Sequence, residues 1–438
     1  MGKRMGIAGR DIKGLFLSSI VLLALASQSC RVSEVSKRAF SFTAGRLQPG
    51  YTQVAPEIKY DAQRGYGFLE SGTATSTKIF LVDLDEGNYD VTVRLGDAAR
   101  ETSTTIKAEA RRLMLLKVET KAGEFVTRTF TVNVRKPAIS TGGEVKLNTR
   151  EKGPSPSCSW DGCLTLEFNG KQPGVAAVEI KPSTEAITVF LAGDSTVTDQ
   201  AREPYSGWGQ MLPRFFRPGV AVANHAESGL ALHSFESQKR LEKILSMMKN
   251  GDYLFIQFGH NDQKDKSANA GPFTSYKANL KRFVAATRSK GATPVLVTPM
   301  ERRRWKDGDP QLTLADYAEA VRQVGVEENA PLIDLHAMSR KLYAALGEEK
   351  STKAFVFYPA NTYPGQDKKL EDNTHHNTFG GYELARCMVE GIRVKVPQLA
   401  TYLDENAALF DPAKPDEPEH VGIPASPISG STEKPAGN

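Results

Sequence analysis

In the first half of the chain, apolar and polar residues alternate with a period of two. The alternation is clearest in three runs, at residues 89–95, 130–134 and 164–168. Gly-Asn or Asn-Gly pairs flank the first and the last run, and no long helical pattern interrupts this half. A period of two is typical of strands with one buried face. The pattern predicts an all-β region over residues 31–184, arranged as a β-sandwich.

From about residue 185 the pattern changes to short apolar runs separated by amphipathic segments. Five runs have the length of buried strands, at residues 187–192, 220–224, 253–258, 293–298 and 331–335. The clearest amphipathic segment is 234–250, and a final one runs through Tyr382 and Val389. Strands that alternate with helices predict βαβ units, right-handed crossovers and a parallel sheet. We place this α/β domain at residues 185–410.

The two ends of the chain differ from these domains in composition. Residues 1–30 join a basic stretch to an apolar run at 15–26 that is too short for a good membrane span, which predicts an export signal. Ala-Leu-Ala at 24–26 fits ordinary cleavage. Cys30 offers lipid anchoring instead, although the residues before it lack the aliphatic residue of a lipobox. We expect a periplasmic or extracellular protein, bound to a membrane only if Cys30 is lipidated. Residues 411–438 are Pro-rich and polar, which predicts a disordered tail.

Charge and cysteine content narrow the function classes. The chain has 438 residues, a length that fits two domains, and a net charge of only +5. Its Lys and Arg residues are spread along the chain, which argues against nucleic-acid binding. Cys158 and Cys163 are close in sequence and form either a disulfide after export or two unpaired thiols. Neither Cys-x-x-Cys nor His-Glu-x-x-His occurs, so the sequence predicts no metal site.

Chemically versatile residues gather in four short stretches. Three of them follow predicted strands and one precedes the final helix, at residues 193–195, 224–229, 259–262 and 372–376. In an open parallel sheet, ligands bind outside the carboxyl ends of the strands. We therefore expect the four stretches to meet at one edge of the sheet.

Together these stretches contain the parts of a serine esterase. Ser195 is the candidate nucleophile, and a serine oxygen needs a base to take its proton during attack. His375 is the candidate base, and Asp372, three residues earlier, is placed to orient its ring. The candidate oxyanion donors are the backbone N–H groups of Ser195 and Gly229 and the side-chain amide of Asn261.

Each of these residues also has an ordinary structural explanation. Ser195 could cap a helix after a strand, and Asn261 could form an Asx turn. Asp194 is more simply a turn cap than a second acid. His376 competes with His375, but the Asp-x-x-His spacing favours His375. A metal held by the two adjacent histidines is disfavoured, because their side chains diverge and no third ligand is evident.

The four stretches resemble the four blocks of the GDSL-type SGNH hydrolases, esterases named for Ser, Gly, Asn and His. In this chain these positions are Ser195, Gly229, Asn261 and His375. Gly-Asp-Ser-Thr departs from the family's Gly-Asp-Ser-Leu, and together with Gly-His-Asn-Asp and Asp-Asn-Thr-His it is most similar to the rhamnogalacturonan acetylesterase branch, carbohydrate esterase family twelve. The resemblance covers about residues 185–400 and implies a flavodoxin-like three-layer α/β/α domain. It also implies a reaction without metal or other cofactor that releases acetate through an acetyl-serine.

The resemblance implies an acetylated plant cell-wall polysaccharide as substrate, with pectic rhamnogalacturonan first and xylan or a small ester as alternatives. The candidate substrate contacts are Trp208, His260, Arg302, Arg303 and His376. An Arg pair near the sheet edge could clamp galacturonate carboxylates, whereas Trp208 fits sugar stacking or packing equally well. A hypothesis from another class is a non-catalytic carbohydrate-binding protein. The β region would then bind sugar through aromatic residues such as Tyr66, Phe68 and Trp160.

Overall fold

The computed structural model describes residues 2, 37–43, 48–69, 77–152, 159–363, 365–427 and 434–436. Apart from Gly2, the predicted export signal with Cys30 lies outside the described residues, as does Cys158. Residues 35–438 form one compact unit. Within the described part of the chain, no helix is long and apolar enough to cross a membrane.

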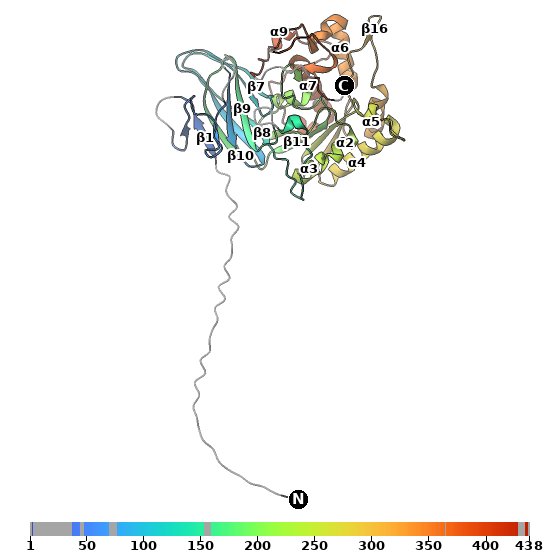
Figure 1. The fold of residues 1–438 in the computed structure, drawn as a ribbon, viewed down its shortest axis with the longest axis horizontal. Coiled ribbons are helices and arrows are strands. Elements are labelled where there is room, and N and C mark those ends of the chain that lie inside the picture. Colours follow the sequence, from blue (N-terminus) through green and yellow to red (C-terminus); the bar gives the residue numbers. More distant parts are fainter. Residues whose placement is uncertain are drawn as a thin grey trace. The chain divides into compact units, whose positions relative to one another are not determined.

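Residues 38–182, called the β half below, form two five-stranded sheets (Figure 1). The first runs in the order β2 (Thr52–Gln53), β1 (Arg38–Ser41), β10 (Val175–Pro182), β5 (Gly87–Gly96) and β8 (Phe125–Val134). The second runs in the order β3 (Tyr66–Phe68), β4 (Lys78–Asp83), β9 (Cys163–Gln172), β6 (Thr102–Ala108) and β7 (Arg112–Thr120). All neighbouring strands are antiparallel except β1 and β2.

The alternating residues of the two sheets bury one shared apolar cluster. Val91 and Val93 of β5 enter it from one sheet, and Phe80 and Leu166 enter it from the other. Phe68 is part of this packing, whereas Trp160 packs in a separate small cluster with Val145, and each of these two aromatic residues is 5% exposed. The Trp160 indole N–H donates to Glu151 Oε1 over 3.1 Å. A carbohydrate-binding face built on these rings is therefore wrong for Phe68 and Trp160.

The second half contains a five-stranded parallel sheet. Its order is β13 (Val220–Asn224), β11 (Ile187–Gly193), β14 (Tyr253–Gln257), β15 (Thr293–Val297) and β18 (Leu332–Ile333). Numbered along the chain, this is order 2-1-3-4-5, as in flavodoxin-like sheets. The parallel sheet predicted from the alternating pattern is confirmed. Its strands lie within two residues of the predicted ones at most ends, and β18 is shorter.

Helices cover both faces of this sheet, because alternate strand residues point to opposite sides. Val189 and Leu191 join a cluster with α1 (Trp208–Met211), α6 (Leu335–Ser351) and α7 (Thr378–Lys395). Phe190 and Ala192 join a second cluster with α2 (Leu232–Ser237), α3 (Arg240–Met247), α4 (Lys277–Arg288) and α5 (Ala315–Glu327). The short helices α8 (Pro397–Ala400) and α9 (Pro418–Val421) follow. The arrangement is a three-layer α/β/α half.

The single helix predicted over residues 234–250 is two helices. Lys239 lies between α2 and α3 with φ 62°, in the left-handed region. An L-residue in that conformation ends a right-handed helix. The apolar positions on both sides still face one cluster, because Phe235, Leu241 and Ile244 are all in it. The hydrophobic pattern therefore located the buried face but not the break.

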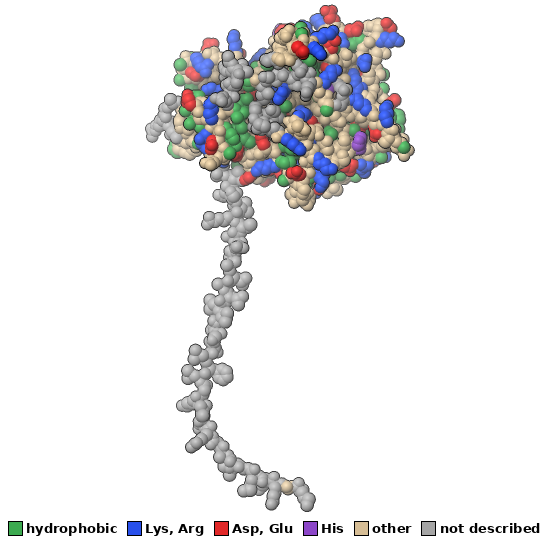
Figure 2. Space-filling view, viewed as in Figure 1, with side chains coloured by type: hydrophobic (Ala, Val, Ile, Leu, Met, Phe, Trp, Pro, Cys, Tyr) green, Lys and Arg blue, Asp and Glu red, His purple; other side chains and the backbone are tan. Residues whose placement is uncertain are grey.

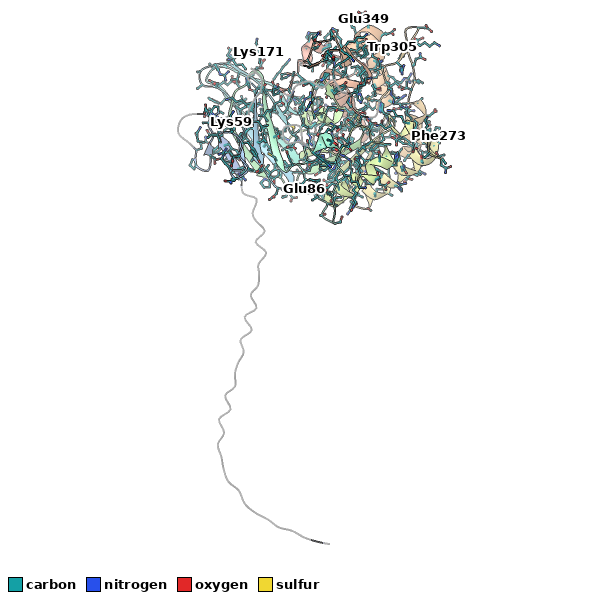
Figure 3. All side chains as sticks on the ribbon, viewed as in Figure 1. Lys59, Glu86, Lys171, Phe273, Trp305 and Glu349 are labelled. Atoms are coloured by element: carbon teal, nitrogen blue, oxygen red, sulfur yellow. The ribbon has the colours of Figure 1, made fainter. Side chains whose placement is uncertain are left out.

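A small antiparallel sheet lies beside α7 and was not predicted. Its order is β12 (Tyr205–Ser206), β20 (Leu370–Asn377) and β19 (Phe355–Tyr358). A two-stranded hairpin, β16 (Trp305–Lys306) with β17 (Asp309–Pro310), extends the loop after β15. Trp305 and the side chains around it are drawn in Figure 3.

Buried cations join the β half to the parallel-sheet half. Arg111 precedes β7 and Arg112 is its first residue, and each is 1% exposed. Arg111 pairs with Glu203 at 2.5 Å and donates to the carbonyls of Gln200 and Tyr205. Arg112 pairs with Asp199 at 2.6 Å. Both acids lie in the segment directly after Ser195. Two buried ion pairs therefore fasten the candidate nucleophile loop to the β half.

Residues 411–427 are packed against the rest of the chain. Lys107 Nζ donates to the Pro424 carbonyl over 2.7 Å and to Ser426 Oγ over 2.8 Å. The Ser426 N–H donates to Glu203 Oε1 over 3.1 Å, and Val421 lies in the main apolar cluster. The predicted disorder is wrong for this part of the tail, because buried polar groups of the β half bind its backbone.

Candidate active site

Ser195 lies just beyond β11, at the carboxyl edge of the parallel sheet. The turn it sits on is tight, since the N–H groups of Val197 and Thr198 both donate to the Asp194 carbonyl over 3.1 Å. A Cβ on Gly193 would lie 2.5 Å from Val197 Cγ2 and 3.0 Å from the Gln257 carbonyl oxygen. Only glycine fits there, which explains the Gly that precedes Asp194 and Ser195.

Ser195, His375 and Asp372 form a continuous hydrogen-bonded line. His375 Nε2 lies 2.8 Å from Ser195 Oγ, and His375 Nδ1 lies 2.8 Å from Asp372 Oδ2. Because an ionised carboxylate only accepts, Nδ1 carries the ring proton, and Nε2 faces the serine hydroxyl as the acceptor. The structure thus brings Ser195 into contact with His375, which lies 180 positions later in the sequence.

A bulge in β20 makes the contact between Asp372 and His375 possible. In a regular strand, residues three apart point to opposite faces. Here Phe355 pairs with His376 while Val356 pairs with Asp372, so the residues between them are looped out of the ladder. The Asp372 Oδ1 atom accepts from the N–H groups of Thr374 and His375 across this loop. The stretch is therefore a bulged strand.

Asp372 stays ionised in this setting. It is 1% exposed, and burial alone would raise its pKa. The hydrogen bond and charge of His375, with the two backbone N–H groups, outweigh burial and lower the pKa of Asp372 to about 2. The Tyr205 ring packs edge-on against the His375 ring with centroids 5.8 Å apart. The ring is therefore held from two sides.

The three other sequence stretches meet beside Ser195. The backbone N–H of His225 donates to the Leu191 carbonyl over 3.0 Å, and that of Glu227 donates to the Gly193 carbonyl over 3.1 Å. Asn261 Nδ2 donates to the Leu230 carbonyl over 3.1 Å. These bonds bring the 224–229 stretch and the adjoining Leu230 against the nucleophile turn and Asn261, and the sequence predicts that these stretches meet.

Gly229 and Asn261, the other candidate oxyanion donors, lie on loops that backbone geometry and hydrogen bonds hold in place. Gly229 has φ +82°, a left-handed backbone that suits glycine. Asp262 joins the same loops, since its carboxylate accepts the N–H groups of Leu232 and Gly259 over 3.0 Å. Burial raises the pKa of Asp262 to about 7. Asp262 was part of the motif but had no role assigned from sequence.

The C-terminal residues 434–436 lie over this site. Lys434 Nζ is 4.0 Å from Asp372 Oδ2. A Cβ on Gly229 would lie 3.2 Å from Ala436 Cβ. Ser195 is only 4% exposed and His375 2%. These residues of the tail therefore contribute to the covering of the candidate catalytic groups.

Asp194 and His260 form a buried pair behind the nucleophile turn. Asp194 Oδ1 accepts from the N–H and the hydroxyl of Thr196, over 2.9 and 2.7 Å. Its Oδ2 atom is 3.3 Å from His260 Nδ1. Burial lowers the pKa of His260, although Asp194 opposes this. Asp194 is thus the turn cap, and His260, 1% exposed, supports that turn and is not placed as a substrate contact.

Two other suggested substrate contacts are buried packing residues. Trp208 is 1% exposed, and its indole N–H donates to Gln257 Oε1 over 2.8 Å. His376 Nε2 is 2.8 Å from the Tyr343 hydroxyl, and burial lowers the pKa of His376 to about 3. Neither ring can stack on a sugar in this arrangement. For Trp208 the packing alternative holds.

In the loop after β15, the side chains of two arginines form hydrogen bonds to other residues of the protein. Arg302 donates to Thr313 Oγ1 over 3.2 Å and to the His260 carbonyl over 3.3 Å. Arg303 donates to Ser351 Oγ and to Asn373 Oδ1, each over 3.0 Å. Asn373 belongs to the bulge between Asp372 and His375. Arg303 therefore supports β20, and a clamp on substrate carboxylates stays a prediction.

Sequence reasoning missed two polar residues that hold the nucleophile turn. Gln200 Nε2 donates to the Ser195 carbonyl over 2.9 Å, and Gln257 Nε2 donates to Thr196 Oγ1 over 2.7 Å. Gln257 is the last residue of β14, just before the 259–262 stretch, a position that could have drawn attention to it. Among the residues that the structure describes, no group of three or more His, Cys, Asp or Glu could hold a metal ion.

Some known proteins are similar to the part of the chain that contains the motifs, and others are similar to most of its length. The model of the GDSL-like lipase/acylhydrolase family matches residues 191–355. The rhamnogalacturonan acetylesterase RhgT of Bacillus subtilis (strain 168) is 42% identical over 209 residues, which are 47% of this chain and 89% of that protein. The chain belongs to the GDSL-like lipase/acylhydrolase family. It is accordingly an ester hydrolase.

Other relatives of this GDSL-like chain match both of its halves. The uncharacterized esterase YxiM of Bacillus subtilis (strain 168) is 26% identical over 408 residues, 86% of this chain and 96% of that protein. The crystal structure of the YxiM protein covers 82% of this chain and 99% of its own, with a TM-score of 0.45 and 26% identity.

Proposed function

We propose that this protein is an acetylesterase that removes acetyl groups from pectic rhamnogalacturonan, with Ser195 as its nucleophile. The observation that carries the proposal is the line from Ser195 Oγ through His375 to Asp372, with 2.8 Å at both contacts. In fold terms, an SGNH-type domain at residues 185–410 follows a β-sandwich domain at residues 31–184. The chain is exported to act on this polysaccharide outside the cytoplasm.

The reaction proceeds in two steps. Ser195 Oγ attacks the acetyl carbonyl and gives its proton to His375 Nε2, and the N–H groups of Ser195, Gly229 and Asn261 stabilise the oxyanion. The sugar hydroxyl leaves with that proton, and acetyl-serine remains. Water then attacks with His375 as base, and acetate and free Ser195 are formed. Asp372 holds the ring tautomer and stabilises the imidazolium in both steps.

The substrate class rests on the similarity to a protein named rhamnogalacturonan acetylesterase, 42% identical across 89% of its length. The proposed reaction does not depend on the sugar, because the nucleophile, the base and the oxyanion donors all act on the acetyl ester. Acetylated xylan or a small ester would be cleaved by the same chemistry. Acetate release from each substrate therefore distinguishes between them.

The test compares acetate release by the wild type, Ser195→Ala and His375→Ala on acetylated rhamnogalacturonan, homogalacturonan and xylan. We expect either substitution to lower kcat by about 10⁴-fold or more, with an unchanged circular dichroism spectrum. A fluorophosphonate probe should label the wild type and not Ser195→Ala. Wild-type activity in Ser195→Ala would overturn the mechanism. A preference for xylan would change the substrate alone.

A further inference from the structure

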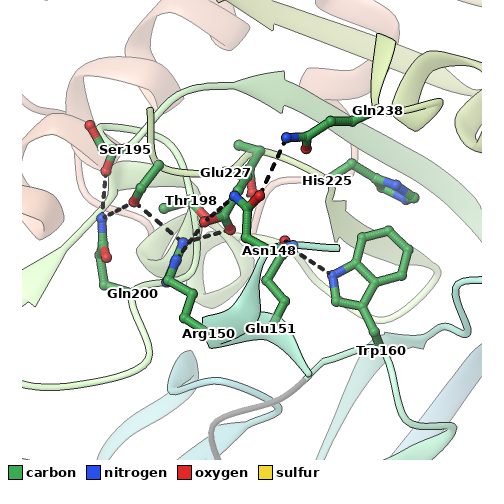
Figure 4. Close-up of polar contacts among 12 residues, drawn as sticks. Asn148, Arg150, Glu151, Trp160, Ser195, Thr198, Gln200, His225, Glu227 and Gln238 are labelled. Atoms are coloured by element: carbon green, nitrogen blue, oxygen red, sulfur yellow. Dashed lines mark hydrogen bonds and ion pairs between the residues drawn. The ribbon is translucent and has the colours of Figure 1, made fainter. Parts of the chain in front are cut away.

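We propose that Arg150, from the β half, is a positioning residue for the oxyanion donor Gly229. The proposal rests on the function proposed above, in which Gly229 stabilises the oxyanion. It gives the β half a part in catalysis, through a loop at residues 148–151 that contacts the 227–229 segment (Figure 4).

The first step is a two-point grip on Glu227. Arg150 Nε donates to Glu227 Oε1 over 2.5 Å, and Arg150 Nη2 donates to Glu227 Oε2 over 2.6 Å. Such a fork fixes orientation as well as distance, which a single contact does not. The Glu227 side chain is 3% exposed, whereas that of Arg150 is 33% exposed. The acid is buried in the parallel-sheet half, and the cation reaches it from the edge.

The second step links this grip to the residue before Gly229. Arg150 Nη2 also donates to Ser228 Oγ over 3.3 Å, and Gln200 Nε2 donates to the same oxygen over 3.4 Å. Gln200 Nε2 in turn binds the Ser195 carbonyl over 2.9 Å. Ser228 is therefore held from both sides, by the β half and by the nucleophile loop. The peptide between Ser228 and Gly229 carries the donor N–H.

The third step is the rigidity of the loop that presents Arg150. Its neighbour Glu151 forms a buried pair with Arg240 of α3, at 2.5 Å and 3.1 Å. Arg240 also donates to the His225 carbonyl over 3.2 Å, just before the 227–229 segment. Asn148 Nδ2 donates to Glu227 Oε1 over 3.4 Å. The loop and the segment are thus fastened at two adjacent points.

Geometry at the oxyanion site matters because an effective donor lies about 2.7–3.1 Å from the position of the oxyanion. Gly229 has a left-handed backbone, which sets the direction of its N–H. A change in the conformation of the 227–229 segment would turn that N–H away. Arg150 limits those conformations through Glu227 and Ser228. Its loss is expected to lower kcat, which reports the transition state, and to leave KM nearly unchanged.

The experiment measures kcat and KM for p-nitrophenyl acetate with the full chain. We expect Arg150→Ala to lower kcat tenfold or more with KM within twofold of wild type. Arg150→Lys keeps the charge but loses the two-point contact, and it should lower kcat by at least threefold. This variant provides the test if Arg150→Ala does not fold. In the double variant with Glu227→Gln, the loss should be no greater than that of the more damaging single change.

The matched control is Glu86→Gln, at another charged contact between the same halves. Lys243 of α3 pairs with Glu86 at 2.7 Å, and Glu86 is labelled in Figure 3. Glu86 makes no contact with the 227–229 segment, so its substitution should lower the melting temperature and leave kcat within twofold. The proposal is overturned if Arg150→Ala and Arg150→Lys behave like Glu86→Gln, with lower melting temperatures and unchanged kcat.

A pH profile separates this proposal from the function on which it rests. Arg150 does not touch His375 or Asp372, so the acid limb of kcat/KM should keep its midpoint in Arg150→Ala while the plateau falls. A shifted midpoint would contradict action through Gly229. If the wild type cleaves no ester and takes no fluorophosphonate label, the proposed function fails, and this inference with it. If the wild type is active and Arg150 has no effect on kcat, this inference alone fails.

Discussion

At the scale of single residues, Asp372 keeps its charge although it is buried. Its carboxylate accepts three hydrogen bonds, from the His375 ring and from two backbone N–H groups. All three favour the ionised form, so the pKa falls to about 2 although the residue is buried. Acid inactivation in the mildly acidic range is therefore not caused by protonation of Asp372.

Replacing this carboxylate should damage the rate and the stability together. We expect Asp372→Asn to lower kcat by about 10²- to 10⁴-fold, because the His375 tautomer is no longer fixed. The lowered pKa of Asp372 also favours folding by about 2 kcal/mol at neutral pH. That contribution is present above its ordinary pKa of 3.8 and is lost as the pH falls toward about 2.

The measurement is urea unfolding of wild type and Asp372→Asn at pH 7 and at pH 3. The difference in unfolding free energy should be smaller at the lower pH. A difference that grows as the pH falls would show that the carboxylate does not favour folding in its ionised form.

Sequence reasoning found the members of the line but not the surroundings of each residue. The spacing from Asp372 to His375 favoured the histidine that the structure places against Ser195. Nothing in the sequence marks His376 as facing Tyr343, or Trp208 as facing Gln257. Motif neighbours look alike in sequence, and only packing decides which of them point inward.

At the scale of elements, tight backbone conformations bring the chemistry together. The bulge of β20 joins Asp372 to His375, and the left-handed Gly229 ends the second stretch. The predicted parallel strands explain why the stretches meet at one edge. The bulge, the break at Lys239 and the antiparallel sheet of β12, β20 and β19 depend on long-range pairing, which periodicity along the chain does not record.

Gly229→Ala tests the left-handed turn directly. A side chain at φ +82° costs roughly 1–2 kcal/mol, and a Cβ would also lie 3.2 Å from Ala436. We expect lower stability and a kcat reduced at least tenfold, because the N–H proposed as an oxyanion donor is displaced.

The matched variant is Gly251→Ala, at φ +87° with no atom within 4 Å of a new Cβ. It carries the same backbone strain far from any motif. Thermal melting should show a similar loss for both variants, and only Gly229→Ala should lose activity in an acetate-release assay. Equal activities of the two variants would argue against a special role for position 229.

At the scale of the whole molecule, the two halves share a charged and buried boundary. On the exposed face drawn in Figure 2, basic and acidic side chains are interspersed. Inside, Arg111 and Arg112 meet Glu203 and Asp199 with almost no exposure. Buried ion pairs contribute little net stability, because desolvation offsets their attraction. Removing one partner, however, leaves an uncompensated charge in the interior.

Arg111→Ala should therefore destabilise the protein by about 3–5 kcal/mol, since Glu203 would stay buried without its partner. Arg282→Ala, in the exposed pair with Glu236, should cost about 1 kcal/mol or less. Chemical denaturation of both variants gives the comparison. Similar losses for the two would mean that the boundary is more open to water than the structure shows.

This boundary is the part of the fold that sequence reasoning could not reach. The division into a β half and an α/β half follows from the change of period near residue 185. Arg150 and Glu227 are 77 positions apart, in segments with different periods, and no motif connects them. The packing of residues 411–427 was missed for a related reason, because the hydrogen bonds that help hold it join segments far apart in the sequence.

The same boundary limits how such a chain can be rearranged in evolution. In the Bacillus subtilis protein RhgT, the 209 matched residues make up 89% of the length, which leaves too few residues for a β half of this size. A recombination crossover between the halves of the present chain would leave Glu203, Asp199 and Glu227 without their cations. The halves should therefore be inherited together, and substitutions on one side of the boundary should be matched on the other.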